Sequence, residues 1–322
     1  MLTESGAPGS PGALSPLDTK GAVDSLIDYA NTDHVRFGTG WSVDDTCGEV
    51  GTGEMALMWA RSGSGKSTWY LNVIRNTPDV PTLVVNMEMT PRRQMEWLTA
   101  MTFDITTAGR DLEAVLRAGP QDDRYPEARV ALEQMPDRYN HLYFVSPSRP
   151  TISDLGFLLD DIEDASGVRP QRVFVDHMGL MGGAETGYDG YVRTSSGLHS
   201  FAMKEDIAMY VLQQVGRSGG DQGRNDGHLP VTFSSGLYTG EQDADWVYGL
   251  YRPDRDPKFK RSKYQFDDPE DYYQMVDKYN AVRGHVIFQV IKNRPFSEVC
   301  EDGITLIYDP HTRRYREVGA IS

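Results

Sequence analysis

Cysteine and long apolar runs are both scarce in this sequence. Its 322 residues include two cysteines, Cys47 and Cys300, too few for a disulfide framework or for a zinc site built on cysteine alone. No apolar run approaches the roughly 18 residues that a membrane-spanning helix needs, so no membrane partner is expected. These absences favour a chain that works in a reducing cytoplasm.

Positive charge is scarce as well. Lys and Arg number 32 against 47 Asp and Glu, a formal charge of −15. Proteins that bind nucleic acid usually have the opposite balance. The deficit counts against a protein that coats DNA with its outer surface. It does not exclude DNA binding in a narrow channel, where the local electrostatic potential matters more than the net charge. In that case a single subunit should bind DNA poorly.

The N-terminus lacks the basic segment and apolar core of a signal peptide. Gly, Ser, Pro and Ala fill most of residues 1–17, which predicts a disordered tail. Apolar residues then recur at helical spacing within residues 18–35, which we interpret as a linker or docking helix. It could pack on its own domain or on a neighbouring subunit. Residues 36–322 remain for one large domain.

That domain alternates short apolar runs with segments of helical spacing. Strands are predicted over residues 55–60, 82–87, 141–145, 172–176 and 208–214, and helices over 67–75, 91–101, 110–135 (broken near Pro120 and Pro126), 153–165 and 194–206. This order predicts an α/β fold with a mostly parallel sheet covered by helices on both faces. Later strands without helices (245–252, 284–292, 303–308 and 314–318) predict an antiparallel C-terminal extension, interrupted by a charged insertion at 253–283.

Residues 60–67 read Ala-Arg-Ser-Gly-Ser-Gly-Lys-Ser, between a predicted strand and a predicted helix. This is the context of a P-loop, whose backbone N–H groups bind phosphate at a helix N-terminus. Lys66 would reach the β- and γ-phosphates of ATP, and Ser67 would hold Mg²⁺. The alternative is a glycine-rich turn without a ligand. The expected ATP-binding residues are Ser62, Gly63, Ser64, Gly65, Lys66, Ser67 and Thr68.

Three polar residues at strand ends could complete this site. Asp176 ends an apolar strand and is the candidate second metal ligand beside Ser67. Glu88 follows the strand at 82–87 and could orient and deprotonate the attacking water. Gln214 could contact the γ-phosphate, with Gln213 as the competing choice because adjacent strand residues face opposite sides. Each could instead be an ordinary strand-end or turn residue.

These motifs in this order resemble the C-terminal motor domain of the replicative DnaB-type helicases, which has a RecA-like fold. The likeness covers roughly residues 36–318 and is carried by residues 39–41 and 53–55, 86–90, 175–181, 212–217, 241–245 (Glu-Gln-Asp-Ala-Asp) and 292–294. It favours Gln214 over Gln213. It implies a DNA-stimulated ATPase that forms a homohexamer with ATP sites between subunits. Lys292 and Arg294 would then act on the neighbour's γ-phosphate.

The resemblance also implies single-stranded DNA as a partner, held by loops that face a central channel. Those loops correspond to residues 182–198 and 218–240, although simple flexible surface loops are the alternative. Residues 233–236 lack the arginine that the family pattern has near this loop. The candidate DNA-binding residues are Arg193, Arg217, Arg224 and Gly236.

The sequence departs from the family pattern at its N-terminus. We expect this chain to lack the helical domain through which full-length members bind primase, as in a compact, phage-like helicase of a bacterium or an infected cell. A loader or a primase remains a candidate partner. The rival functions are a RecA-like recombinase or mediator, a DNA-binding or loader protein switched by ATP, and a signalling ATPase of the circadian-clock type.

Overall fold

The computed structural model describes residues 19–21, 23, 27, 35–105, 112–182, 188–214, 229–232 and 240–319. The chain divides into two compact units, residues 1–35 and 36–322. In the first unit, residues 19–21, 23 and 27 are helical and Val35 is not; the predicted tail and the rest of the predicted helix lie outside the described residues. No helix in the described ranges is long and apolar enough to cross a bilayer.

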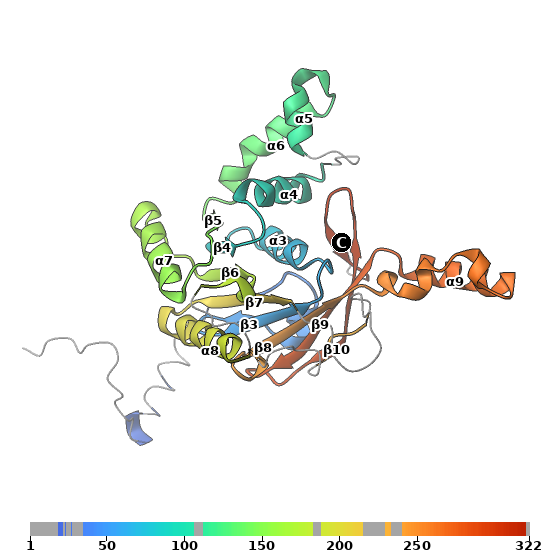
Figure 1. Cartoon of the computed structure of the whole chain (residues 1–322). Coiled ribbons are helices and arrows are strands. Elements are labelled where there is room, and N and C mark those ends of the chain that lie inside the picture. The colour runs from blue at the N-terminus through green and yellow to red at the C-terminus, as the bar shows by residue number, and fades with distance from the viewer. Residues whose placement is uncertain are drawn as a thin grey trace, which may run out of the picture. The chain divides into compact units, whose positions relative to one another are not determined.

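The second unit is built on a sheet of nine strands, in the order β11-β10-β9-β8-β3-β7-β6-β4-β5 (Figure 1). The strands from β8 to β5 run parallel, whereas β9, β10 and β11 continue the sheet antiparallel. The predicted α/β fold with an antiparallel extension is therefore confirmed. The strands are β3 (Met55–Ala60), β4 (Thr82–Asn86), β5 (Leu142–Val145), β6 (Arg172–Asp176), β7 (Ala208–Gln214), β8 (Trp246–Tyr251), β9 (His285–Asn293), β10 (Cys300–Tyr308) and β11 (Tyr315–Glu317).

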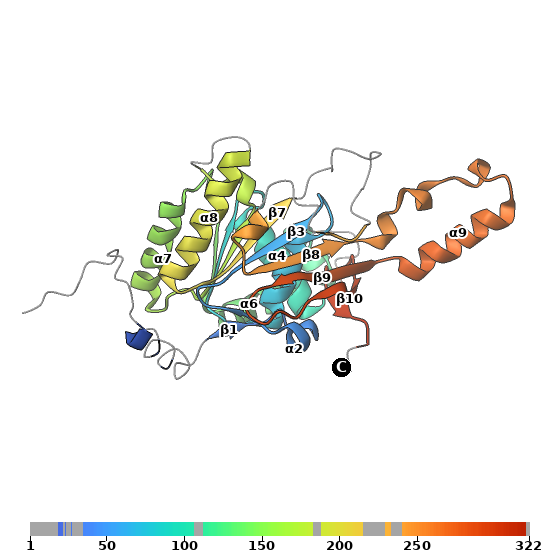
Figure 2. The same ribbon diagram turned by 90° about the horizontal axis from the view of Figure 1, so that it is seen from below.

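Helices cover both faces of this sheet, as Figure 2 shows for α7 and α8 on one side. Strand β3 explains why two faces are buried. Its residues alternate between two apolar clusters, with Leu57 and Trp59 in one and Met58 and Ala60 in the other. The helices are α3 (Lys66–Asn76), α4 (Pro91–Phe103), α5 (Leu112–Ala118), α6 (Tyr125–Arg138), α7 (Ile152–Ser166) and α8 (Tyr188–Glu205).

A small element precedes the sheet. The strands β1 (Arg36–Phe37) and β2 (Val50–Gly51) pair antiparallel around the short helix α2 (Val43–Cys47). The side chain of Cys47 is buried and is a free thiol. None of these elements was predicted, because each is too short to show a periodic pattern.

The expected channel loop at residues 182–198 was wrong over its second half. Helix α8 begins at Tyr188, so Arg193 lies on a helix and not in a loop. Ser195, Leu198 and Ala202 are fully buried at helical spacing against the sheet. The Gly- and Ser-rich composition of residues 190–197 concealed this face, because small side chains pack there in place of large apolar ones.

The insertion at 253–283 forms an arm between β8 and β9. It contains three short 3₁₀ turns, Pro253–Arg255, Pro257–Lys260 and Lys263–Gln265, followed by α9 (Pro269–Val282). Figures 1 and 2 show α9 extending away from the sheet. No residue of α9 is buried, which explains why the charge pattern marked this segment but its apolar pattern did not predict a helix.

Candidate functional site

The P-loop connects β3 to α3 at the carboxyl edge of the parallel strands. Gly63 and Gly65 adopt positive φ angles of 71° and 103°, and a Cβ at Gly65 would collide with the hydroxyl of Tyr315. These glycines let the loop turn sharply ahead of the helix. The hydroxyl of Ser64 is buried and has no hydrogen-bond partner in the described part of the chain.

Lys66 is the first residue of α3 and is 8% exposed. Its ammonium group lies 3.4 Å from the carbonyl oxygen of Ala60. Burial lowers the pKa of Lys66, while Asp176 and Glu88 act in the opposite direction. A buried ammonium facing two carboxylates is suited to a polyanionic ligand.

Asp176 ends β6 and faces the P-loop helix. Its Oδ2 accepts hydrogen bonds from the Ser67 hydroxyl at 2.7 Å and from the Asn86 side chain at 3.0 Å. Its Oδ1 is buried without a partner among the described residues, and burial raises the pKa of this carboxyl. An unpartnered carboxylate oxygen beside a serine hydroxyl fits the oxygen ligands that Mg²⁺ prefers. Ser67 and Asp176 are therefore the residues that would hold the ion.

Glu88 sits in the turn that follows β4. Asn86 fixes this turn, since its Oδ1 accepts hydrogen bonds from the backbone N–H groups of Glu88 at 2.8 Å and Met89 at 2.6 Å. The carboxylate of Glu88 lies 3.4 Å from the ring of His177 and lines the same pocket as Lys66. Asn86 thus ties the metal-side Asp176 to the position of Glu88. Its sequence position in the strand-end motif gave no sign of this role.

The structure separates the two glutamines at the end of β7. Gln213 is 1% exposed and accepts a hydrogen bond from the indole of Trp59 at 2.8 Å. Gln214, one residue later, pairs in register with Ala60 and lines the pocket. Only Gln214 is therefore placed to contact a ligand there.

The pocket around the P-loop has a volume of about 330 Å³. Sequence reasoning had placed ten residues of one subunit at the site, and eight of them line this pocket: Ser62, Gly63, Gly65, Lys66, Ser67, Thr68, Glu88 and Gln214. The other two, Ser64 and Asp176, are fully buried and do not line it. Sequence reasoning missed one side of the pocket, because the residues there come from distant segments of the chain that share no motif. The missed residues are Trp97, Arg252, Arg255, Tyr308, Arg313 and Tyr315.

This missed side combines rings with cations. The Arg313 guanidinium lies 3.9 Å from the ring centre of Trp97, and Arg252 lies 5.5 Å from that of Tyr308. Flat aromatic and guanidinium surfaces can stack on a nucleobase, whereas the P-loop side offers donors for phosphate. The two halves of the pocket therefore match the two ends of a nucleotide.

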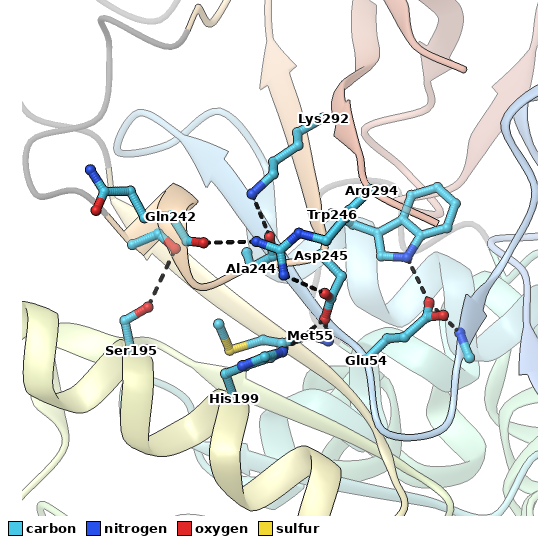
Figure 3. A network of polar contacts seen from close by, with 12 residues as sticks. Glu54, Met55, Ser195, His199, Gln242, Ala244, Asp245, Trp246, Lys292 and Arg294 are labelled. Carbon is cyan, nitrogen blue, oxygen red and sulfur yellow. Dashed lines mark hydrogen bonds and ion pairs between the residues drawn. The ribbon is translucent and has the colours of Figure 1, made fainter. Parts of the chain in front are cut away.

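Lys292 and Arg294 lie elsewhere, against the Glu-Gln-Asp-Ala-Asp segment at 241–245 (Figure 3). The Lys292 ammonium donates to the carbonyl oxygens of Glu241 at 2.5 Å and Ala244 at 2.7 Å. The Arg294 guanidinium pairs with Asp245 at 2.9 Å. Neither side chain is among the described residues lining the nucleotide pocket of its own chain. The pair would thus have to act on another subunit.

Asp245 is the centre of this network and is 8% exposed. Besides Arg294, its carboxylate accepts from the backbone N–H of Met55 at 3.0 Å and lies 3.1 Å from the His199 ring (Figure 3). It therefore links β3, α8 and the end of β9. This explains why an acidic residue occupies a position between a turn and a buried strand.

Asp245→Ala is expected to lower the free energy of unfolding by about 2–4 kcal/mol, because the Met55 N–H and the Arg294 charge both lose a partner. Urea denaturation measures this change. The matched control is Asp243→Ala, in the same segment but outside the network, with an expected change within about 0.5 kcal/mol. Equal stability of the two variants would show that the network does not hold this edge together.

Of the four residues predicted to contact DNA, Arg193 alone lies in the described part of the chain. It is exposed on α8. Arg217, Arg224 and Gly236 lie outside the described residues. The same ranges contain no group of three or more His, Cys, Asp or Glu side chains placed to hold a metal ion.

Comparisons with known proteins agree with this geometry. A family model described as "DnaB-like helicase C terminal domain" matches residues 39–315. The solved "ATPase Domain of G40P" has a TM-score of 0.68 and 16% identity, over 91% of this chain and 95% of that one. "The Structure Of A DnaB-Like Replicative Helicase And Its Interactions With Primase" has a TM-score of 0.68 and 17% identity, over 92% and 67%.

These identities are low, so the two solved structures show a shared fold. Among curated proteins, no sequence matches this chain. The family model is the stronger finding, since it spans the P-loop, the strand ends and the late basic pair in one continuous match. The chain belongs to the family of DnaB-like helicase C-terminal domains.

Proposed function

We propose that this protein is an ATP-driven DNA helicase motor that moves along single-stranded DNA as a homohexameric ring. One observation carries the proposal: the P-loop, Glu88 and Gln214 line one pocket, with Asp176 hydrogen-bonded to Ser67 of that loop, whereas Lys292 and Arg294 are bonded to the 241–245 segment and do not line the pocket. The pocket has groups for the base, the phosphates and the attacking water, but the Lys292 and Arg294 pair of the same subunit is bonded elsewhere, which suits a site completed by the corresponding pair of a neighbour.

ATP binding would use the groups already aimed at the pocket. The P-loop N–H groups and Lys66 bind the phosphate chain, and the rings of Tyr308 and Tyr315 provide a surface for the base. Ser67 and Asp176 would hold Mg²⁺, which would neutralise charge on the phosphates. Burial of Lys66 strengthens its attraction for the ligand, since little water screens it.

Hydrolysis would begin with a water held by Glu88. The carboxylate accepts a proton from this water as its oxygen bonds to the γ-phosphorus and the bond to the β,γ-bridging oxygen breaks, which leaves ADP. Asn86 positions Glu88 through the turn after β4. Lys292 and Arg294 of the adjacent subunit would stabilise the charge that develops on the transferred group.

Movement along DNA requires that the change from ATP to ADP in the pocket alters the segments that contact DNA. Gln214 is the last residue of β7 and lines the pocket, so it can report the γ-phosphate to the segment that follows it in the chain. A partner of the primase or loader type is a further proposal. It rests on the solved relative whose description includes interactions with primase.

A forked-duplex assay with a mass measurement tests the proposal. With ATP and Mg²⁺, the protein is expected to displace one strand of the fork and to form a species six times the 36.0 kDa monomer. Lys66→Ala serves as the inactive control. Strand pairing without unwinding would favour a recombinase. A monomer that leaves the fork intact would contradict the helicase proposal.

A further inference from the structure

The arm at residues 253–283 begins beside the P-loop. Its first 3₁₀ turn, Pro253–Arg255, follows β8 directly. The Arg255 guanidinium lies 3.4 Å from the carbonyl oxygen of Ser62, and Arg255 lines the same pocket as Lys66 and Ser67. An insertion that otherwise extends away from the sheet therefore contributes one cation to the nucleotide pocket.

Gly63 makes this approach possible. A Cβ at that position would lie 2.8 Å from Nη1 of Arg255, closer than real side chains approach one another. The φ angle of 71° at Gly63 is also one that favours glycine. The absence of a side chain on the loop thus leaves the guanidinium in contact with the P-loop backbone, where Arg255 lines the nucleotide pocket.

Two arginines, Arg252 and Arg255, lie at the two ends of this turn. The Arg252 guanidinium donates from Nε and Nη2 to the two carboxylate oxygens of Asp254, at 3.1 Å and 2.8 Å, so an acid of the arm balances its charge. One contact of Arg255 is with the carbonyl oxygen of Ser62 in the P-loop, at 3.4 Å. A phosphate oxygen bound in this pocket would be a stronger acceptor for the same guanidinium, since charged pairs form shorter hydrogen bonds.

We propose that Arg255 binds the γ-phosphate of ATP in its own subunit, so that the arm is anchored to the pocket by the triphosphate and released with the diphosphate. This inference rests on the proposed ATPase function and extends it to the insertion. Arg255 is a phosphate-binding group supplied in cis. It is distinct from Lys292 and Arg294, which lie at the 241–245 segment.

The chain after Arg255 can transmit this contact. Asp256 caps the next turn by accepting from the Lys258 N–H at 2.9 Å, and its carboxylate pairs with the Lys258 ammonium at 2.6 Å. These local contacts order the chain from Asp256, the residue after Arg255, to Lys258, at the start of the basic segment that leads to the exposed Tyr264. Holding the guanidinium on a phosphate would restrict the start of the arm.

Equilibrium binding of Mg²⁺ with either ADP or the β,γ-imido analogue of ATP tests the contact. Arg255→Ala is expected to weaken binding of the triphosphate analogue by about 10- to 100-fold, as for loss of one charged hydrogen bond, and binding of ADP by less than about threefold. Arg255→Lys should recover part of the loss. Lys263→Ala, on the same arm beside Tyr264, is the matched control and should bind both nucleotides normally.

Cleavage by chymotrypsin at Tyr264 reports on the arm itself. The triphosphate analogue is expected to slow cleavage of the wild-type protein more than ADP does, and Arg255→Ala should lose that difference. If Arg255→Ala binds both nucleotides like the wild type, or loses both equally, the inference is overturned. If the wild-type protein binds neither nucleotide, the proposed function itself fails.

Discussion

Lys66→Ala is expected to lower the rate of ATP hydrolysis by about 10³-fold or more. Removing one preorganised neutral donor from a developing anion costs about 10²–10³ in rate, and a charged donor forms the stronger bond. Lys66 is buried and faces the ligand from the first turn of α3, so solvent cannot replace its charge. Steady-state release of phosphate measures the change.

Lys204→Ala provides the control for Lys66→Ala. Lys204 is an exposed lysine near the end of α8, paired with Glu205 at 2.6 Å and outside the pocket. Its removal should leave hydrolysis unchanged. Removing a buried ammonium also relieves a desolvation cost, so Lys66→Ala should unfold no more easily than the wild-type protein. Substantial activity in Lys66→Ala would show that this pocket is not the ATP site.

Glu88→Gln is expected to reduce kcat by about 10²–10⁴ while nucleotide affinity changes little, because an amide cannot accept the proton of the attacking water. Gln preserves the size of the side chain and leaves the hydrogen bond that the backbone N–H of residue 88 donates to the Asn86 side chain. Single-turnover hydrolysis, together with nucleotide titration, separates the chemical step from binding.

A second carboxylate controls for general effects of neutralising an acid. Glu96 lies on α4 and pairs with Arg93 at 2.7 Å, and it does not line the nucleotide pocket. Glu96→Gln should therefore hydrolyse ATP at the wild-type rate. A protein that uses ATP only as an assembly switch would keep its DNA binding in Glu88→Gln and show no turnover to lose. Normal kcat in Glu88→Gln would mean that another group activates the water.

The sequence predicted the parallel half of the fold well because its strands are buried on both faces. A short apolar run between polar residues, as at residues 173–175, is typical of a central strand, and β6 spans Arg172–Asp176. Parallel strands end at one edge of the sheet, so the polar residues at their ends are expected to lie close together. Asp176 was predictable for that reason, whereas Lys66 was predicted from the P-loop motif at residues 60–67.

Other parts of the site had no local signal. Trp97 and Tyr315 are far apart in the chain and meet at the pocket only after α4 and β11 are in place. Each resembles an ordinary aromatic residue in sequence. Likewise, the first half of α8 buries Thr194 and Ser195, so its packing face there is small and polar instead of apolar. Patterns based on large apolar residues therefore predicted a helix only from residue 194 and missed its first turns.

The negative charge of the chain is consistent with the site. The chain has 15 more Asp and Glu than Lys and Arg, yet the nucleotide pocket is lined by four cations, Lys66, Arg252, Arg255 and Arg313, and by one carboxylate, Glu88. The net charge of the whole chain therefore does not determine the sign of the electrostatic potential in one pocket. The same reasoning applies to a channel formed by several subunits.

The rate of ATP hydrolysis with and without single-stranded DNA tests the motor proposal most directly. DNA is expected to raise the rate by about tenfold or more, because aligning an arginine finger with the γ-phosphate can contribute about 10³–10⁵. The stimulation should disappear in Arg294→Ala. A rate that is the same with and without DNA, from a protein that binds ATP, would contradict a motor driven along single-stranded DNA.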